Sequence, residues 1–201
     1  MVDEYYHKQS RKRESQYLLV SDFIRGVTVE FEIVSGIFSY KRIDPGIKLL
    51  LEYAEIPSEG MVLDIGCGYG AIGITIAKLN PKLIVYMVDI NNEATRLAKR
   101  NVLRNGLDPS RVIVLQGNLY DAVKGLTLDA IYSNPSPVAG LQIVERIIRE
   151  APQHLKPNGT LQLVMRKGYE KAKKLMQEVF GNAEIKVAKK GYRLLFSRKL
   201  I

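Results

Sequence analysis

A glycine-dense turn between an apolar strand and a helix is the feature that most constrains how this chain can fold. The apolar run 61–65 leads into Gly66, Gly68 and Gly70, and a helical pattern follows over residues 71–79. Glycine suits such a turn because the backbone takes unusual angles there and because a side chain would block a ligand that approaches the backbone. Ligands of open α/β sheets bind beyond the carboxyl ends of the strands, so the turn predicts a ligand site at that edge.

Apolar segments of strand length alternate with helical segments through most of the chain. We expect strands over residues 61–65, 84–89, 112–116, 130–133 and 160–165. We expect helices over residues 71–79, 92–105, 140–154 and 168–180. This alternation predicts an α/β fold whose mostly parallel sheet carries helices on both faces.

The N-terminal part of the chain has a different pattern. Residues 1–16 are polar and mixed in charge, which indicates an arm or a short helix outside the core. Residues 27–34 alternate apolar and polar side chains like a half-buried strand, and a helix opened by Pro45 follows. We therefore expect a polar arm and then a single domain over residues 17–201, with a leading segment at residues 20–58.

The C-terminal part combines a hairpin pattern with most of the excess charge. Strands expected at 183–188 and 192–197 flank a Lys189-Lys190-Gly191 turn and form a closing hairpin. The whole chain has a net charge of +9, and residues 166–201 hold 11 Lys and Arg against 3 Asp and Glu. Such a cluster indicates a polyanionic partner such as nucleic acid, with a merely solvated helix face as the alternative.

The composition excludes several classes of protein. With 46% hydrophobic residues the 201-residue chain can bury a core, and its apolar runs fall far short of the roughly 18 residues that a membrane span needs. Cys67 is the only cysteine, so an internal disulfide and a cysteine-based zinc site are both excluded, and the two histidines are isolated. We expect a cytoplasmic protein without membrane contact and without a metal.

The residues around the glycine turn leave two classes of ligand open. Gly66, Gly68 and Ala71 satisfy the relaxed dinucleotide-binding pattern, and Asp89 has the spacing of a ribose-binding acid. Asp64, directly before the turn, would repel a pyrophosphate and attract a cationic ligand such as the ammonium of a methionine moiety. The residues favour the cationic ligand, and an NAD-dependent dehydrogenase is the remote alternative.

The turn resembles the cofactor loop of class I S-adenosylmethionine-dependent methyltransferases. Ser35-Gly36-Ile37-Phe38-Ser39 and Asp44-Pro45-Gly46-Ile47-Lys48-Leu49-Leu50-Leu51 are similar to the leading segment of the small-domain methyltransferase family, and Gly191-Tyr192-Arg193 is similar to its end. That family includes the catalytic halves of bacterial ribosomal-RNA guanine-N2 methyltransferases and stand-alone archaeal members. The resemblance covers residues 20–200 and implies a Rossmann-like, seven-stranded sheet in the order 3-2-1-4-5-7-6, with the last strand antiparallel.

The resemblance also implies that S-adenosylmethionine is the cofactor, and it assigns the contacts to the methionine part by position. Asp64 would meet the amino group of the cofactor, directly or through water. The backbone at Gly66, Cys67, Gly68 and Gly70 would lie along its methionine part.

The contacts to the nucleoside part follow in the same way. Asp89 would accept both ribose hydroxyls, Ile90 would pack on the adenine face, and Asn118 would reach the adenine edge. For Asn118 a role as a turn or helix-cap residue is the alternative.

Asn134 and Pro135 are the catalytic candidates. Asn134-Pro135-Ser136-Pro137 resembles the Asn-Pro-Pro-aromatic motif of enzymes that methylate amide or exocyclic amino nitrogens. Such a nitrogen attacks poorly because its lone pair is delocalised. The Asn134 side-chain oxygen and the Pro135 carbonyl can hold its two N–H groups and turn the lone pair toward the methyl donor. Without the upstream glycine turn, a simple turn start would be the preferred interpretation.

The substrate-binding candidates come from three parts of the chain. Ser136 and Pro137 replace the second proline and the aromatic residue of the motif, which removes base stacking worth about 1 to 3 kcal/mol. Phe38 or Tyr40 from the leading segment can supply a stacking surface instead, with core packing as the alternative role for Phe38, so we include Phe38 and Pro137. The candidate phosphate contacts, which the implied topology places at the edge of the glycine turn, are Arg166, Lys167, Lys189, Lys190 and Arg193.

The leading hypothesis is a methyltransferase that uses S-adenosylmethionine to methylate an amino nitrogen of structured RNA, with a ribosomal guanine N2 as the first candidate. A protein glutamine-amide methyltransferase is one alternative, because those enzymes share the loop motif. A catalytically inactive RNA-binding module of the same fold is another, motivated by Ser136 and Pro137. The basic cluster favours RNA as the partner, and the oligomeric state stays open.

Overall fold

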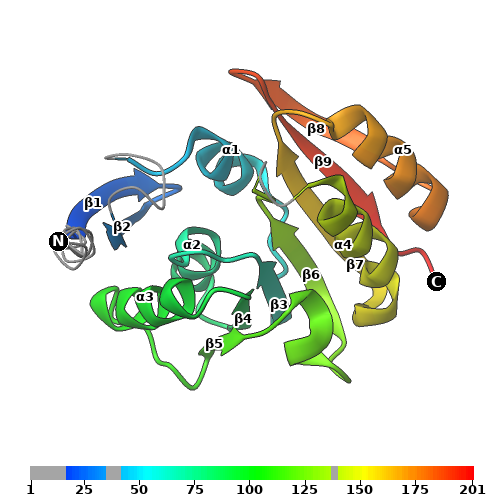
Figure 1. Ribbon diagram of the computed structural model, residues 1–201. Coiled ribbons are helices and arrows are strands. Elements are labelled where there is room, and N and C mark those ends of the chain that lie inside the picture. The colour runs from blue at the N-terminus through cyan, green and yellow to red at the C-terminus, as the bar shows by residue number, and fades with distance from the viewer. Residues whose placement is uncertain (1–16, 35–41, 137–139) are drawn as a thin grey trace, which may run out of the picture.

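A seven-stranded sheet organises the computed structural model, which describes residues 17–34, 42–136 and 140–201 (Figure 1). Its order is β5-β4-β3-β6-β7-β9-β8, which is 3-2-1-4-5-7-6 when counted from β3. The first five of these strands pair in parallel, and β9 runs antiparallel to both of its neighbours. The predicted Rossmann-like fold class is confirmed. The strands are β3 (Gly60–Ile65), β4 (Leu83–Asp89), β5 (Val112–Gln116), β6 (Leu128–Ser133), β7 (Leu155–Met165), β8 (Glu184–Lys189) and β9 (Tyr192–Arg198).

Helices cover both faces of the sheet, as the alternating pattern predicted. One apolar cluster packs α1, α2 and α3 on one face, and a second packs η1, α4 and α5 on the other. Strands buried on both faces read as continuous apolar runs, which is why the sequence revealed them. The helices are α1 (Pro45–Tyr53), α2 (Ala71–Leu79), α3 (Asn92–Arg104), η1 (Leu119–Val123, a 3₁₀ turn), α4 (Leu141–His154) and α5 (Tyr169–Phe180).

A separate antiparallel hairpin of β1 (Tyr17–Ile24) and β2 (Val27–Val34) precedes the sheet. The sequence predicted β2 but not β1. Leu19 and Phe23 of β1 are exposed on one face, whereas Val20 is buried on the other. Apolar residues on both faces hide the alternation by which a half-buried strand is recognised.

Two asparagines, Asn101 of α3 and Asn105 directly after it, close the edge of β2. Asn105 accepts from the backbone N–H of Glu30 (3.0 Å) and donates to its carbonyl (2.7 Å), and Asn101 does the same with Glu32 (2.8 and 3.0 Å). The Asn101 amide also donates to the carbonyl of Tyr69 in the glycine turn (2.9 Å). The side chains thus replace a neighbouring strand, and they tie the hairpin to the turn.

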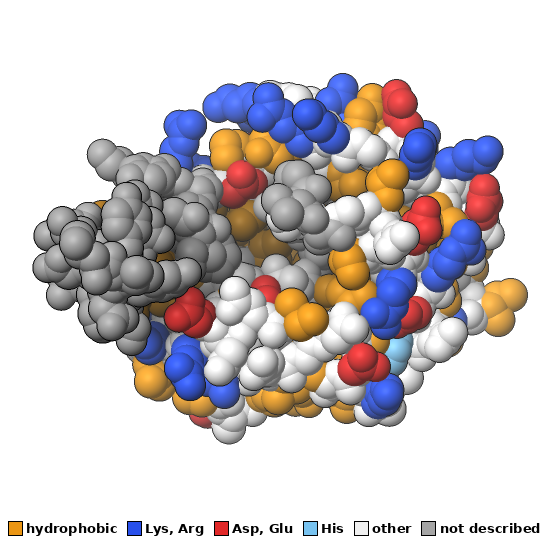
Figure 2. Space-filling model, in the orientation of Figure 1, with side chains coloured by type: hydrophobic (Ala, Val, Ile, Leu, Met, Phe, Trp, Pro, Cys, Tyr) orange, Lys and Arg blue, Asp and Glu red, His pale blue; other side chains and the backbone are white. Residues whose placement is uncertain are grey.

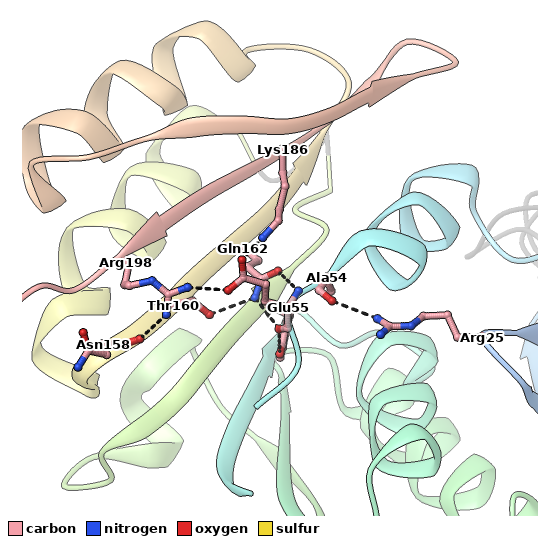
Figure 3. A network of polar contacts seen from close by, with 9 residues as sticks. Arg25, Ala54, Glu55, Asn158, Thr160, Gln162, Lys186 and Arg198 are labelled. Carbon is pink, nitrogen blue, oxygen red and sulfur yellow. Dashed lines mark hydrogen bonds and ion pairs between the residues drawn. The ribbon is translucent and has the colours of Figure 1, made fainter. Parts of the chain in front are cut away.

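The edge of the seven-stranded sheet opposite the glycine turn is formed by the amino ends of its parallel strands. This edge carries a network of polar contacts around Glu55, which follows α1 (Figure 3). Its carboxylate pairs with Lys186 of β8 and with Arg198 of β9 (2.6 Å). The side chain of Gln162 accepts from the Glu55 backbone N–H (3.0 Å) and donates to its carbonyl (2.8 Å). The network fastens the end of α1 to the C-terminal strands.

Some predictions differ from the structure or lie outside it. The strand β7 begins at Leu155, directly after α4 and before the predicted start at residue 160. The predicted arm at residues 1–16, Phe38 and Pro137 lie outside the described residues. Within the described ranges, no helix is both long and apolar enough to cross a membrane.

Candidate cofactor and substrate site

A pocket of about 440 Å³ opens at the carboxyl ends of β3, β4 and β6. A volume of this size suits a small ligand or cofactor. Eight of the predicted site residues line the pocket: Gly66, Cys67, Gly68, Asp89, Ile90, Asn118, Asn134 and Pro135. Its other walls come from Asp44, Ile47, Tyr69, Ile72, Ser133, Ser136, Ile143 and Ile147, among others.

The glycine turn forms the floor of this pocket and has the backbone angles that the sequence predicted. Gly66, Gly68 and Gly70 have φ values of 69°, 55° and 94°, which only glycine adopts without strain. A Cβ at Gly66 would meet open space, whereas one at Gly70 would lie 2.8 Å from a methyl of Ile74. Gly66 therefore leaves the backbone accessible, and Gly70 permits close packing at the start of α2.

Asp89 connects the turn to the end of β4. One carboxylate oxygen accepts from the backbone N–H of Gly68 (2.9 Å), and the other accepts from that of Asn91 (2.8 Å). Each oxygen keeps acceptor capacity toward the pocket, because an ionised carboxylate offers about four lone-pair sites. The neighbouring Ile90 is 68% exposed and gives the wall an apolar surface.

Asp64 lies beneath the turn as a buried carboxylate with one unsatisfied oxygen. Its Oδ2 accepts from the backbone N–H of Gly73 (2.9 Å), and its Oδ1 has no hydrogen-bond partner. Burial raises the pKa of the Asp64 carboxyl to about 7; the charge of Asp89 adds to the rise and the Gly73 N–H opposes it. An orphaned acceptor of this kind is what a cationic ligand group would satisfy.

Asn134 and Asp44 meet across the pocket. Asn134 follows β6, and its amide Nδ2 donates to Oδ1 of Asp44 (3.2 Å), the N-cap residue of α1. Tyr192, at the start of β9, donates its hydroxyl to Oδ2 of the same carboxylate (3.2 Å). In the sequence Asp44 was noticed only as part of the segment that resembles the family, and a side chain that caps a helix gives no sequence signal that it also faces a site.

Asn118 follows β5 and lines the pocket beside Gly117. It precedes η1, but its side chain makes no capping hydrogen bond. The capping alternative therefore finds no support in the structure. Asn118 therefore lies in the pocket wall, and its contact to the adenine edge stays a prediction.

The predicted phosphate contacts lie outside the pocket, near the tip of the β8–β9 hairpin. Figure 2 shows Lys and Arg side chains gathered there. Arg166, Lys167, Lys189 and Lys190 are exposed, and Arg193 is half-buried, with its guanidinium over the ring of Tyr169.

The tip of the hairpin is tied to the pocket through Tyr192. The guanidinium of Arg166 lies 5.9 Å from the centre of the Tyr192 ring, and Tyr192 contacts Asp44 in the pocket wall. The basic residues thus border the site.

The residues of the site fit S-adenosylmethionine better than they fit a metal ion. In the described part of the chain no three His, Cys, Asp or Glu side chains come together as metal ligands. Asp89 lines the pocket and fits a ribose, whereas Asp64 is buried behind the lining residues, where its orphaned oxygen is an acceptor of the kind that an ammonium group needs. Open backbone at Gly66 and the apolar surface of Ile90 complete a cradle for the methionine and adenine parts.

Comparisons with known sequences show the family of the chain. The family model for the methyltransferase small domain matches residues 28–196. The uncharacterized protein YbxB of Bacillus subtilis (strain 168) is 32% identical over 203 residues, which cover 99% of this chain and 100% of YbxB. Ribosomal RNA small subunit methyltransferase C of Pseudomonas entomophila (strain L48) is 33% identical over 163 residues, which cover 79% of this chain and 48% of that protein.

Comparisons with solved structures place the fold in the same group. The T. thermophilus 16S rRNA N2 G1207 methyltransferase, in complex with AdoMet and guanosine, has a TM-score of 0.80 and 26% identity over 92% of this chain and 51% of that one. A methyltransferase from Pyrococcus furiosus, 23% identical with a TM-score of 0.62, shares the fold. The chain spans about half the length of the ribosomal RNA methyltransferases that it matches. Because the family model covers most of the chain, the predicted family is confirmed, and the protein belongs to the methyltransferase small domain family.

Proposed function

We propose that this protein uses S-adenosylmethionine to methylate an amino nitrogen of structured RNA, with the exocyclic N2 of a ribosomal guanine as the first candidate. The observation that carries the proposal is the position of Asn134 beside Pro135 in the pocket wall. The side-chain NH₂ of Asn134 donates a hydrogen bond to Asp44. This contact leaves the Asn134 carbonyl oxygen available as an acceptor. The guanosine complex of the T. thermophilus relative supports the choice of base.

The residues of the pocket divide the work between holding the cofactor and holding the target. Asp64, Asp89 and the backbone at Gly66 and Gly68 would hold S-adenosylmethionine, which supplies an electrophilic methyl group on a sulfonium. Asn134 would accept an N–H of the target amino group, and this orients the nitrogen and stabilises the positive charge that develops on it. No general base is required before transfer, because the proton leaves afterwards.

The basic residues near the hairpin tip support RNA rather than protein as the substrate. Arg166 and Lys189 are exposed on the edge that leads into the pocket, and phosphates attract such clusters through a field of several kT. A glutamine side chain is uncharged, so its recognition does not require a cluster of Lys and Arg residues.

A labelled-methyl assay tests the proposal. The protein is mixed with tritiated S-adenosylmethionine and an extract of cells that lack its gene, and RNA and protein are then counted separately. We expect label in RNA, and we expect Asn134→Ala to lower the rate about 100- to 1,000-fold. Asn92→Ala, an exposed asparagine outside the pocket, is the matched control and should keep the rate. Label in protein alone would support the amide methyltransferase instead, and no label in either fraction would support the inactive module.

A further inference from the structure

Three parts of the chain far apart in sequence converge on one carboxylate in the pocket wall. Asp44 Oδ1 accepts from the backbone N–H groups of Gly46 (2.8 Å) and Ile47 (3.2 Å) and from the Asn134 side chain (3.2 Å). Its Oδ2 accepts from the hydroxyl of Tyr192 (3.2 Å). The helix cap fixes the carboxylate, and the carboxylate in turn contacts the catalytic candidate.

The chemistry of the two groups decides how the Asn134 amide is turned. An ionised carboxylate only accepts hydrogen bonds, whereas an amide offers two donors on nitrogen and an acceptor on oxygen. Reversing the amide would bring its oxygen against the oxygen of Asp44, so the NH₂ group has to face Asp44. No residue in the described ranges donates to the Asn134 Oδ1.

We propose that Asp44 is a positioning residue, which fixes the Asn134 amide so that only a target group carrying N–H bonds is accepted. This inference rests on the proposed function. A ring nitrogen without a hydrogen would meet the Asn134 oxygen with its own lone pair and be repelled. The pair therefore selects amino and amide nitrogens over ring nitrogens that carry no hydrogen, such as N7 of guanine.

Tyr192 holds the carboxylate from the side of the β8–β9 hairpin. A Cβ at Gly46 would lie 2.6 Å from Cε1 of the Tyr192 ring, so the close approach depends on glycine at that position. Burial and then the charge of Asp44 raise the pKa of Tyr192, so its hydroxyl stays a donor at neutral pH. The hairpin that carries the basic residues is thereby joined to the group that orients the target.

The first test compares Asp44→Asn with wild type in the RNA methylation assay. Asparagine is as good a helix cap as aspartate, but its side chain can both donate and accept, so it allows either orientation of Asn134. We expect kcat to fall at least tenfold, with the KM for RNA within twofold and the Tm unchanged. Asp108→Asn, an exposed aspartate that accepts from the backbone of Ser110 (2.8 Å), is the matched control and should keep wild-type kinetics.

A double variant shows whether Asp44 acts through Asn134. In an Asn134→Ala background the further change Asp44→Asn should alter kcat less than twofold, because the group to be positioned is gone. If the two losses multiply instead, or if Asp44→Asn keeps the wild-type kcat, the inference is wrong.

A measurement on the protein without substrate separates this inference from the proposed function. The side-chain NH₂ signals of Asn134 are identified in a ¹⁵N spectrum by their absence in Asn134→Ala. We expect them to shift in Asp44→Asn and to stay in place in Asp108→Asn. Unmoved signals would overturn the positioning role even if RNA is methylated, whereas shifted signals without any RNA methylation would overturn only the proposed substrate.

Discussion

The two edges of the central sheet treat acidic side chains in opposite ways. At the carboxyl edge Asp64 is buried with one oxygen lacking a partner. At the opposite edge Glu55 has Lys186 on one carboxylate oxygen and Arg198 on the other (Figure 3). A buried polar atom left unsatisfied costs about 1 to 3 kcal/mol. This contrast is what we expect if the carboxyl edge is arranged for binding at a cost in stability, whereas the paired carboxylate of Glu55 stabilises the other edge.

Backbone strain at one pocket residue fits this contrast, although Arg25 and Lys190, in the two hairpin turns, also have positive φ values. Leu119 lines the pocket with a φ of 55°, a left-handed conformation that costs a residue of its kind about 1 to 2 kcal/mol. At the opposite edge Asn158 has a φ of 67°, but asparagine tolerates that conformation through its short polar side chain. Strain kept by a bulky residue is typical of functional sites, where the surrounding structure holds it in place.

Two aspartates, one at each edge, give the largest expected contrast. Asp89 accepts from two backbone N–H groups at the pocket, and Asp129 accepts from the backbone N–H of Met61 (2.7 Å) and from Lys156 (2.9 Å) at the opposite edge. Changing either to alanine should lower the free energy of unfolding by about 1 to 3 kcal/mol in urea titrations. Only Asp89→Ala should weaken S-adenosylmethionine binding in calorimetry, by about 100-fold, because two ribose hydroxyls lose a charged acceptor.

Either of two results would contradict this division of the edges. One is an Asp89→Ala protein that binds the cofactor within fivefold of wild type. The other is an Asp129→Ala protein whose affinity falls as far as that of Asp89→Ala while it remains folded.

The sequence predicted the carboxyl edge better than the opposite one. Glycines at Gly66, Gly68 and Gly70, and polar residues at the ends of strands, follow from local geometry and so appear as a pattern in the chain. The residues around Glu55 come from four separated segments, and only the folded chain brings Gln162 to its backbone. Networks of that kind have no sequence period, so none was predicted.

Within the site, the same reasoning explains the residues that were missed. Asn134 stands in a recognisable motif, but its partner Asp44 lies 90 positions earlier, in a segment that was noticed only for its family resemblance. Tyr192 was noticed only for its place beside Gly191. Contacts between separate motifs depend on tertiary structure, which local patterns do not encode.

The two carboxylates predict opposite slopes of stability against pH. The pKa of Asp64 is raised from 3.8 to about 7 by burial, so the folded protein binds its proton more tightly and stability falls as pH rises from about 4 to about 7. Burial tends to raise the pKa of Glu55, but hydrogen bonds from Lys186 and Arg198 outweigh it and the net shift is downward from 4.5. Stability from Glu55 is therefore present above about pH 4.5 and is lost as pH falls below it.

Urea midpoints between pH 3 and 8 would measure the two slopes. Asp64→Asn should flatten the decline between pH 4 and 7, and Glu55→Gln should flatten only the acid side. Ionised Asp64 also favours the cofactor's ammonium, so wild-type affinity should rise about tenfold from pH 6 to pH 8, and this rise should be absent in Asp64→Asn. An Asp64→Asn protein with the wild-type pH dependence would show that the orphaned oxygen is not the group that titrates.

Charge reversal at the two edges should give the smallest effect, and it separates RNA binding from general surface charge. Lys189 and Lys190 lie at the hairpin tip, next to the Tyr192 that reaches the pocket, whereas Lys78, near the end of α2, and Lys82, just before β4, lie at the opposite edge. Each phosphate contact on single-stranded RNA contributes about −0.7 to the slope of log affinity against log salt. Changing Lys189 and Lys190 to glutamate should therefore make the slope less steep by about 1.4, and the same changes at Lys78 and Lys82 should leave it unaltered.

Filter binding of rRNA fragments between 50 and 200 mM salt measures both slopes. Equal changes of the salt slope in the two variants would mean that RNA affinity depends only on the net charge of the chain. A change of slope confined to the hairpin variant would place the phosphates at the edge where Asp44 and Asn134 meet.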